Sequence, residues 1–221
     1  QAFNYGMKHL RERCGDDMFI VESIAPLFPY QYANARRVSC DAWGEMWHTN
    51  YMMNSLSFGW WLDRIYPYND PDHLVLNGNS EGANRIRVTT GAMTGTMLLG
   101  DNFSLKGSYP GNQTVRDQAE KVVLNASINA LAQLGRSFRP VEGNMPVNFS
   151  TGSGTYGVEK AFMLDTDNAL YLAVFNYDAS KEATETINLT RLGVNVANVK
   201  RIKELWTDTS VNPTGNELKC E

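Results

Sequence analysis

The sequence predicts an α/β protein: the second half of a (β/α)8 TIM barrel followed by an antiparallel β-sandwich domain. Two observations predict it. In the first 101 residues, four short segments with polar or acidic ends alternate with helical patterns, as in parallel βαβ units. Beyond residue 137, short strand-like segments are separated by clusters of turn-forming residues, as in a sandwich. We therefore expect a barrel half over residues 1–136 and an incomplete sandwich domain over residues 137–221.

In the first half, apolar residues recur at helical spacing over Ala2–Cys14. A buried strand is expected at Met18–Val21, closing on Glu22, and a second strand at Arg37–Asp41. The segment Trp47–Ile65 then has the pattern of a long amphipathic helix.

The same alternation continues with a strand at His73–Leu76, a helix at Glu81–Thr96 and a strand at Met97–Asp101. A helical stretch at Val115–Leu134 ends this half. A complete barrel has eight such units in about 250 residues, so four units make half a barrel. Its two open sheet edges lead us to expect the missing N-terminal half as another chain or as a segment outside this sequence.

The second half contains four predicted strands with turn clusters such as Asp-Thr-Asp-Asn between them. These strands are Val158–Leu164, Ala169–Phe175, Thr184–Leu189 and Val199–Trp206.

Composition restricts the class of protein. The chain has 221 residues, 43% of them hydrophobic, which is enough to bury a core. A net charge of -4 gives no reason to expect a nucleic-acid partner. No segment approaches the roughly 20 apolar residues of a membrane span, and the first residues lack a signal-peptide pattern. Several Asn-x-Ser/Thr acceptors weakly favour a secreted or periplasmic protein.

Metal and cofactor chemistry has little support. The three cysteines Cys14, Cys40 and Cys220 form neither a metal-type pair nor an even disulfide set. His48 and His73 are not at metal-binding spacing, and no phosphate loop or Gly-x-Ser-x-Gly motif occurs. We expect no metal site and no cofactor.

Asp41 is the first candidate for catalysis. It ends a predicted strand, Arg37 precedes it by four residues, and Trp43 and Trp47 follow. Carboxylates at the C-terminal ends of barrel strands are where catalytic groups are expected, and an arginine can fix such a carboxylate. The alternative is an Arg–Asp pair that stabilises the loop, or an N-cap for the next helix.

Two other acidic positions could bind a ligand. In Asn69-Asp70-Pro71-Asp72, one acid can point into a cleft while the other accepts backbone amides, and Asp72 is the better ligand candidate. The same residues also make an ordinary turn. Glu22, at the end of its strand, is either a ligand or simply solvated.

Four tryptophans crowd into one region near His48, as suits a carbohydrate cleft in which sugar C–H faces pack on rings. They are Trp43, Trp47, Trp60 and Trp61. For Trp60 and Trp61, the helical context favours packing instead.

These residues resemble a known family. Arg37–Asp41 is similar to the Arg-x-x-x-Asp motif of melibiase-type α-galactosidases and α-N-acetylgalactosaminidases, and Asn69–Asp72 to their Trp-Asn-Asp-Pro-Asp-Met motif. Arg87–Asp101 resembles the following helix and last barrel strand, and Leu205–Thr207 a Trp-Thr near the end of the sandwich. The loop 23–35 departs from the family, as do Tyr68, where its Trp is usual, and His73, where its Met is usual.

The resemblance implies retaining glycoside hydrolysis without a cofactor. It makes Asp41 the acid/base, Arg37 a cleft residue beside it, Glu22 a ligand of a sugar hydroxyl and Asp72 a further substrate contact. The family's nucleophile lies in a Lys-x-Asp motif on the fourth strand, which would precede Gln1. Retaining hydrolysis needs both carboxyl groups, about 5–5.5 Å apart.

The expected function is therefore cleavage of terminal α-galactosides or related α-glycosides, with a carbohydrate as the partner and the nucleophile upstream of Gln1. One alternative is a non-catalytic carbohydrate-binding or structural protein on the same fold. Another is a related barrel enzyme that cleaves α-glucan or β-arabinopyranoside linkages.

Overall fold

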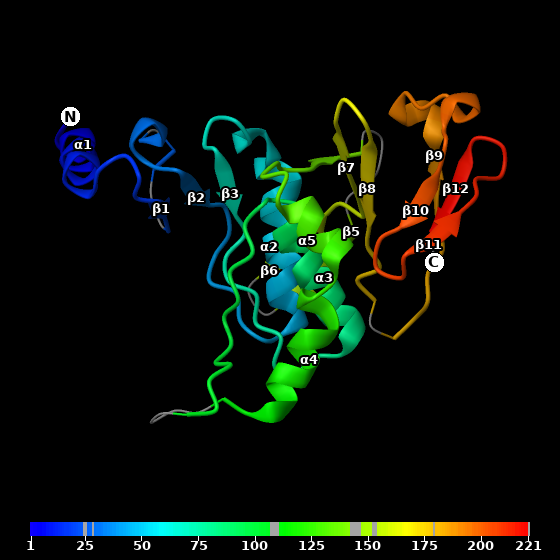
Figure 1. Ribbon diagram of the computed structural model, residues 1–221, viewed down its shortest axis with the longest axis horizontal. Coiled ribbons are helices and arrows are strands. Elements are labelled where there is room, and N and C mark those ends of the chain that lie inside the picture. Colours follow the sequence, from blue (N-terminus) through cyan, green and yellow to red (C-terminus); the bar gives the residue numbers. More distant parts are fainter. Residues whose placement is uncertain are drawn as a thin grey trace.

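The computed structural model describes residues 1–23, 26–27, 29–106, 111–141, 147–151, 154–178 and 180–220, with the backbone alone at 147–151 and 154–157. Figure 1 shows the first helix and three short strands at one end, a central group of helices, and antiparallel strands at the other end.

A parallel sheet opens the fold. Its strands β1 (Val21–Glu22), β2 (Ala35–Arg37) and β3 (Tyr68–Asp70) lie in that order. Val21 pairs with Ala35 and Arg37 with Asp70, both in parallel. Beyond β3, Leu74 and Leu99 form a further parallel bridge. Parallel pairing is therefore confirmed in part: it joins the segments around Val21 and Arg37 and occurs at the Leu74–Leu99 bridge, whereas β3 was not predicted as a strand.

The strand boundaries differ from those predicted. β2 ends at Arg37 instead of Asp41, and β3 covers a segment predicted to be a turn. The cause lies at Asp72: the amide of Val38 donates to the carbonyl of Asp70 (2.8 Å), but the Asp72 amide, which comes next in the parallel ladder, donates to Oδ1 of Asp70 (2.8 Å) instead. Asp72 then turns the chain with a φ of 84°. The strands predicted at 73–76 and 97–101 are reduced to the single Leu74–Leu99 bridge.

Five α-helices occur in the described residues. They are α1 (Ala2–Cys14), α2 (Met46–Gly59), α3 (Glu81–Ala92), α4 (Gln113–Val123) and α5 (Ala126–Ala132). Short 3-10 turns lie at Tyr30–Tyr32, Trp60–Leu62, Leu189–Leu192 and Val196–Asn198. α1 has the predicted bounds, whereas the single stretch expected over 115–134 is two helices. The break occurs because the Asn125 side chain accepts the Ile128 amide (3.0 Å) and so starts a new helix.

The second half is antiparallel, as predicted. One sheet has the order β4-β7-β8, formed by Arg139–Pro140, Ala161–Asp165 and Leu170–Val174. The second half also contains three separate two-stranded sheets. They pair β5 (Val147–Thr151) with β6 (Gly154–Val158), β9 (Glu185–Asn188) with β12 (Glu217–Cys220), and β10 (Ile202–Glu204) with β11 (Thr209–Val211). The strand predicted at 158–164 begins later because Val158 ends β6.

The β4-β7-β8 sheet separates two hydrophobic cores. Successive residues of a strand point to opposite faces, and β7 is buried on both. Phe162 and Leu164 pack into a core with α2, α3, α4 and α5. Ala161 and Met163 pack into a second core with residues of β9 and β12. The first core thus extends across residue 137, the expected domain boundary.

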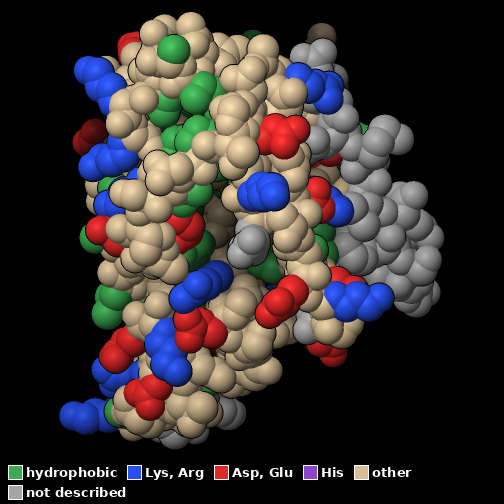
Figure 2. All heavy atoms as spheres, turned by 90° about the vertical axis from the view of Figure 1, so that its right-hand side faces the viewer, with side chains coloured by type: hydrophobic (Ala, Val, Ile, Leu, Met, Phe, Trp, Pro, Cys, Tyr) green, Lys and Arg blue, Asp and Glu red, His purple; other side chains and the backbone are tan. Residues whose placement is uncertain are grey.

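Three further observations concern surface charge, membrane-spanning helices and the cysteines. The face seen in Figure 2 mixes Lys and Arg with Asp and Glu, so neither sign forms a continuous patch there. No helix in the described residues is long and apolar enough to cross a membrane. Cys14, Cys40 and Cys220 are all free thiols.

Candidate active site

The candidate residues emerge at one edge of the parallel sheet. Glu22, Arg37 and Asp70 are the last residues of β1, β2 and β3, and the register places Glu22 beside Arg36 and Arg37 beside Asp70. Because the strands are parallel, all three end at the same edge, and the loops carrying Asp41 and Asp72 start from it. In α/β folds this C-terminal edge is where catalytic groups gather.

Arg37 joins two acids at this edge. Its Nη2 lies 2.8 Å from Oδ1 of Asp41, and its Nη1 lies 3.1 Å from Oδ1 of Asp72. The side chain is only 10% exposed. Burial works to lower the pKa of Arg37, but the attraction of Asp72 and Asp41 outweighs it, so the pKa is raised. The guanidinium is therefore a fixed positive charge that sets the position of both carboxylates.

Asp41 keeps one side open to solvent. Its side chain is 61% exposed, and its second oxygen has no partner among the described residues. A carboxyl group that is held through one oxygen and accessible through the other has the arrangement required for proton transfer to a bound ligand.

Asp72 is buried and already bonded within the protein. It is 5% exposed, its Oδ2 accepts the Ala42 amide (2.6 Å), and its Oδ1 accepts from Arg37 and lies 3.4 Å from Nδ1 of His73. Asp72 therefore connects the loop after β2 to the segment after β3 through hydrogen bonds. Asp70 accepts the Asp72 amide (2.8 Å), and burial raises the pKa of Asp70.

Glu22 is a buried carboxyl group with one unused oxygen. It is 6% exposed, and its Oε2 accepts from the hydroxyl of Tyr66 (3.0 Å). Its Oε1 has no partner in the part of the chain that the structure describes. Burial raises the pKa of Glu22, although the Tyr66 hydrogen bond and the charge of Arg36 oppose the rise. An unused buried acceptor is costly unless a ligand or water completes it.

Two tryptophans flank this edge. Trp43 is 58% exposed and meets the His73 ring edge-on, with 5.3 Å between ring centroids. Trp47 is 37% exposed and its indole donates to Glu45. The Trp43 ring thus supplies apolar surface beside His73, which contacts Asp72. Trp60 and Trp61, for which packing was predicted, are instead 37% and 47% exposed and lie elsewhere.

Arg87 of α3 was not singled out in the sequence, although it supports the site. It is 2% exposed and donates to the carbonyls of Gly44 (2.7 Å), Glu45 (2.8 Å) and Val75 and to the Thr49 hydroxyl (3.0 Å). Burial lowers the pKa of Arg87 to about 10. Arg87 shares one helix face with the buried residues Asn84 and Val88. This helical spacing is the sequence signal that could have identified Arg87 as a buried residue.

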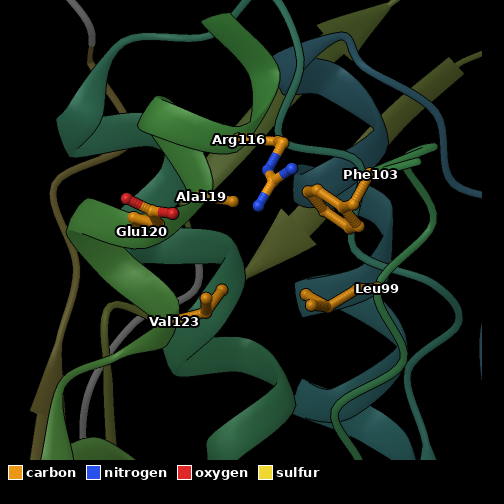
Figure 3. Close-up of a pocket in the computed structure, with 6 residues that line it drawn as sticks. All are labelled: Leu99, Phe103, Arg116, Ala119, Glu120 and Val123. Atoms are coloured by element: carbon orange, nitrogen blue, oxygen red, sulfur yellow. The ribbon is translucent and has the colours of Figure 1, made fainter. Parts of the chain in front are cut away.

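The edge is open in this structure. One hollow, of about 140 Å³, lies between α4 and the segment after Leu99. Figure 3 shows Arg116 of α4 reaching toward Phe103 there, and Glu120 of the same helix also lines the hollow. A second hollow lies near the end of α2. Neither is lined by the four predicted site residues, and no metal-ligating group of three acids, histidines or cysteines occurs in the described residues.

Two solved structures resemble this chain in fold. They are crystal structures of a GH27 β-L-arabinopyranosidase from Geobacillus stearothermophilus, one in complex with arabinose, each with a TM-score of 0.65. The chain has the fold of part of a GH27 glycosidase. The likeness covers 98% of this chain and 51% of each enzyme, at 15% and 16% sequence identity.

The chain therefore spans about half the length of these GH27 enzymes, and at this identity the likeness concerns the fold. No protein-family model matches the chain, and no curated protein matches it in sequence.

Proposed function

We propose that this chain supplies the acid/base part of a retaining glycoside hydrolase. The observation that carries the proposal is the exposed carboxylate of Asp41, held by buried Arg37 at the C-terminal edge of parallel strands. The GH27 fold of the chain supports it, because that fold is shared with an enzyme that acts on a glycoside.

In this proposal Asp41 protonates the leaving oxygen and then takes a proton from the attacking water. Arg37 holds Asp41 in place, and Asp72 holds Arg37. The unused oxygen of Glu22 accepts a sugar hydroxyl. Asp72 contributes to substrate binding through Arg37 and the Ala42 loop, because both of its oxygens are bonded within the protein. Trp43 offers an apolar surface for the sugar ring.

In this proposal the nucleophile lies outside the chain. Of the acids at this edge, Asp70 and Asp72 are bonded within the protein and Glu22 is buried. We propose that an aspartate upstream of Gln1, or on another chain, completes the pair of carboxyl groups about 5–5.5 Å apart. The missing half of a (β/α)8 barrel would carry it, pairing with the open edges of the parallel sheet.

The substrate in this proposal is a terminal α-galactoside or a related glycoside. β-L-Arabinopyranose has the ring stereochemistry of α-D-galactopyranose and lacks only its hydroxymethyl group, so one subsite could accept either sugar. The activity named for the structural neighbours therefore makes β-L-arabinopyranosides the second substrate to test.

Replacement of Asp41 in the full-length gene product tests the role of this residue. Asp41→Asn should lower turnover about 10²–10⁴-fold on substrates with poor leaving groups and much less on an activated aryl glycoside, which needs little protonation. Asp117→Asn, at an exposed position of α4, is the matched control and should leave both rates unchanged. Equal losses on both substrates would remove the acid role, and sugar binding without turnover by the unaltered protein would favour the non-catalytic alternative.

A further inference from the structure

A second aromatic and charged hollow lies away from the candidate active site. It has a volume of about 280 Å³. Its lining comes from the end of α2, the segment before β4 and strand β7: Trp60, Trp61, Asp63, Arg64, Arg136, Ser137, Arg139, Met163, Leu164 and Asp165. The volume is close to the lower end of that seen for ligand pockets and suits a ligand of one sugar ring.

The aromatic part of the hollow is exposed and fixed. Trp60 and Trp61 are 37% and 47% exposed, although a buried position was expected from their helical context. The indole N–H of Trp61 donates to the carbonyl of Phe58 (2.9 Å), which sets the orientation of the ring. Exposed, oriented indole rings offer flat apolar surfaces on which a ligand can pack.

The charged part is also held in place. Both Nε and Nη2 of Arg136 donate to Oδ2 of Asp63 (3.1 and 3.0 Å), and the Ser137 amide donates to Oδ1 (3.1 Å). This leaves Nη1 of Arg136 without a partner among the described residues.

Three further charged residues line the hollow. Arg64 lies 4.0 Å from Asp63, whereas Arg139 and Asp165 do not neutralise each other. Arg139 pairs with Met163 across β4 and β7, and Asp165 follows Met163 on the same face of β7. Neither Arg139 nor Asp165 forms an ion pair with any described residue. An unpaired donor and an unpaired acceptor beside flat rings match a ligand that has hydroxyl groups around an apolar ring face.

The hollow lies at the opposite end of the parallel sheet from Asp41. Trp60 to Arg64 precede the N-terminal end of β3, and Ser137 accepts from the side chain of Asn69 in that strand (2.8 Å). Asp41 follows the C-terminal end of β2. A ligand in this hollow would therefore not contact the candidate acid/base.

We propose that this hollow binds one pyranose residue of a carbohydrate, as a site separate from catalysis. The indole rings cover the C–H face of the sugar, while Arg136 and Arg139 donate to hydroxyl oxygens and Asp165 accepts from a hydroxyl. The choice of galactosides as probes rests on the proposed function, but the site itself does not.

Indole N–H resonances can test the two sites separately. The chain has five tryptophans, and Trp→Phe variants of the full-length protein labelled with ¹⁵N assign their indole signals one by one. Titration with methyl α-D-galactopyranoside and with methyl β-L-arabinopyranoside should shift the Trp60 and Trp61 signals in a saturable way. The Trp43 and Trp47 signals report on the candidate active site, and Trp206 serves as the reference.

Variants then test the contacts. Trp61→Ala should weaken binding, followed at the Trp60 signal, by about tenfold. Asp165→Asn, at an exposed position, tests the hydroxyl acceptor without removing the aromatic surface and should also weaken binding. Phe58→Ala is the matched control, because Phe58 is 63% exposed, adjoins Trp61 and does not line the hollow. It should leave both the affinity and the turnover unchanged, and Trp61→Ala should leave the turnover of a small aryl glycoside unchanged.

The proposal fails if neither sugar moves the Trp60 and Trp61 signals, whatever happens at Trp43 and Trp47. It also fails if acrylamide cannot reach these two indoles in the full-length protein, because another protein segment would then occupy the hollow. If the full-length protein hydrolyses no glycoside but sugar still shifts the Trp60 and Trp61 signals, the proposed function is wrong and the separate sugar site is supported.

Discussion

At the scale of single residues, Arg37 explains why the candidate site has a defined geometry. One buried guanidinium contacts an exposed carboxylate, Asp41, and a buried one, Asp72. The sequence could predict the first contact, since the two residues are four apart at a strand end. The second contact could not be predicted, because it joins residues 35 positions apart and depends on the turn at Pro71 and Asp72.

Asp72 should matter for ligand binding through Arg37 and the loop that carries Asp41. Asp72→Ala removes the acceptor of the Ala42 amide and one partner of Arg37, so we expect inhibitor binding by the full-length protein to weaken by about 1–3 kcal/mol. Glu185→Ala is a matched control, since Glu185 is also a partly buried carboxylate paired with a cation, Lys160, but lines neither hollow. Isothermal titration of a galactose-type inhibitor measures both, and equal losses in the two variants would mean a general effect of destabilisation.

Glu22 should give the protein a pH-dependent stability. Burial raises its pKa above the usual 4.5, so the neutral form is favoured by folding and the ionised form costs stability. This cost is absent below the unfolded pKa and grows as the pH rises through the folded pKa. In urea unfolding, the stability of the unaltered protein relative to Glu22→Gln should therefore increase as the pH falls from 7 toward about 4.5. Glu120→Gln, at an exposed position of α4, controls for removal of a carboxylate, and a difference that shrinks on acidification would contradict the expectation.

At the scale of helices and strands, element type was easier to predict than element ends. α1 follows its apolar spacing, whereas β3 is a buried polar segment that composition marks as a turn. Asn69 can be fully buried there because its amide donates to the Ser137 hydroxyl, a residue 68 positions away. Tertiary hydrogen bonds of this kind decide the local structure and are not visible in a sequence window.

The contacts of Arg87 also depend on how distant elements pack together. From α3 it bonds to carbonyls in the loop before α2 and in the segment after β3, and so fixes both loops of the candidate site. Arg87→Lys keeps the charge but loses most of these donors, and we expect it to lower the free energy of unfolding by about 2–4 kcal/mol. Arg85→Lys on the same helix, where the side chain pairs with Glu81 at the surface, should cost less than about 1 kcal/mol. Chemical denaturation measures both, and similar small losses would show that the buried guanidinium contacts are dispensable.

At the scale of the whole molecule, the strands of the second half stabilise the helices of the first. The indole of Trp206 donates to the Thr89 hydroxyl of α3 (3.2 Å), and Asn125 at the start of α5 donates to the carbonyls of Leu205 and Trp206. With Phe162 packed into the same core, these contacts join the two parts. The sequence predicted an α/β half and an antiparallel half, but the packing between them depends on contacts between distant residues.

The parallel sheet, by contrast, leaves apolar residues uncovered at both of its edges. Met18, Phe19 and Val21 beside β1 are 53%, 51% and 37% exposed, and Leu98 and Leu99 at the other edge are 45% and 42% exposed. α1 contributes no buried residue. An exposed strand edge with large apolar side chains is a site for pairing with further strands. These surfaces match the proposed position of a second set of barrel strands.

The last prediction follows from these open edges: the 221-residue chain alone should not hydrolyse glycosides at a measurable rate. Without a second carboxylate no glycosyl-enzyme intermediate can form, and without strands opposite Asp41 nothing holds the sugar against it. Assays of the purified chain and of the full-length gene product with an aryl α-galactoside and an aryl β-L-arabinopyranoside compare the two directly. We expect turnover only from the longer protein, or from the chain mixed with a polypeptide that supplies the missing strands. Comparable turnover by the chain alone would place the nucleophile within these residues, with buried Glu22 as the first carboxylate to replace.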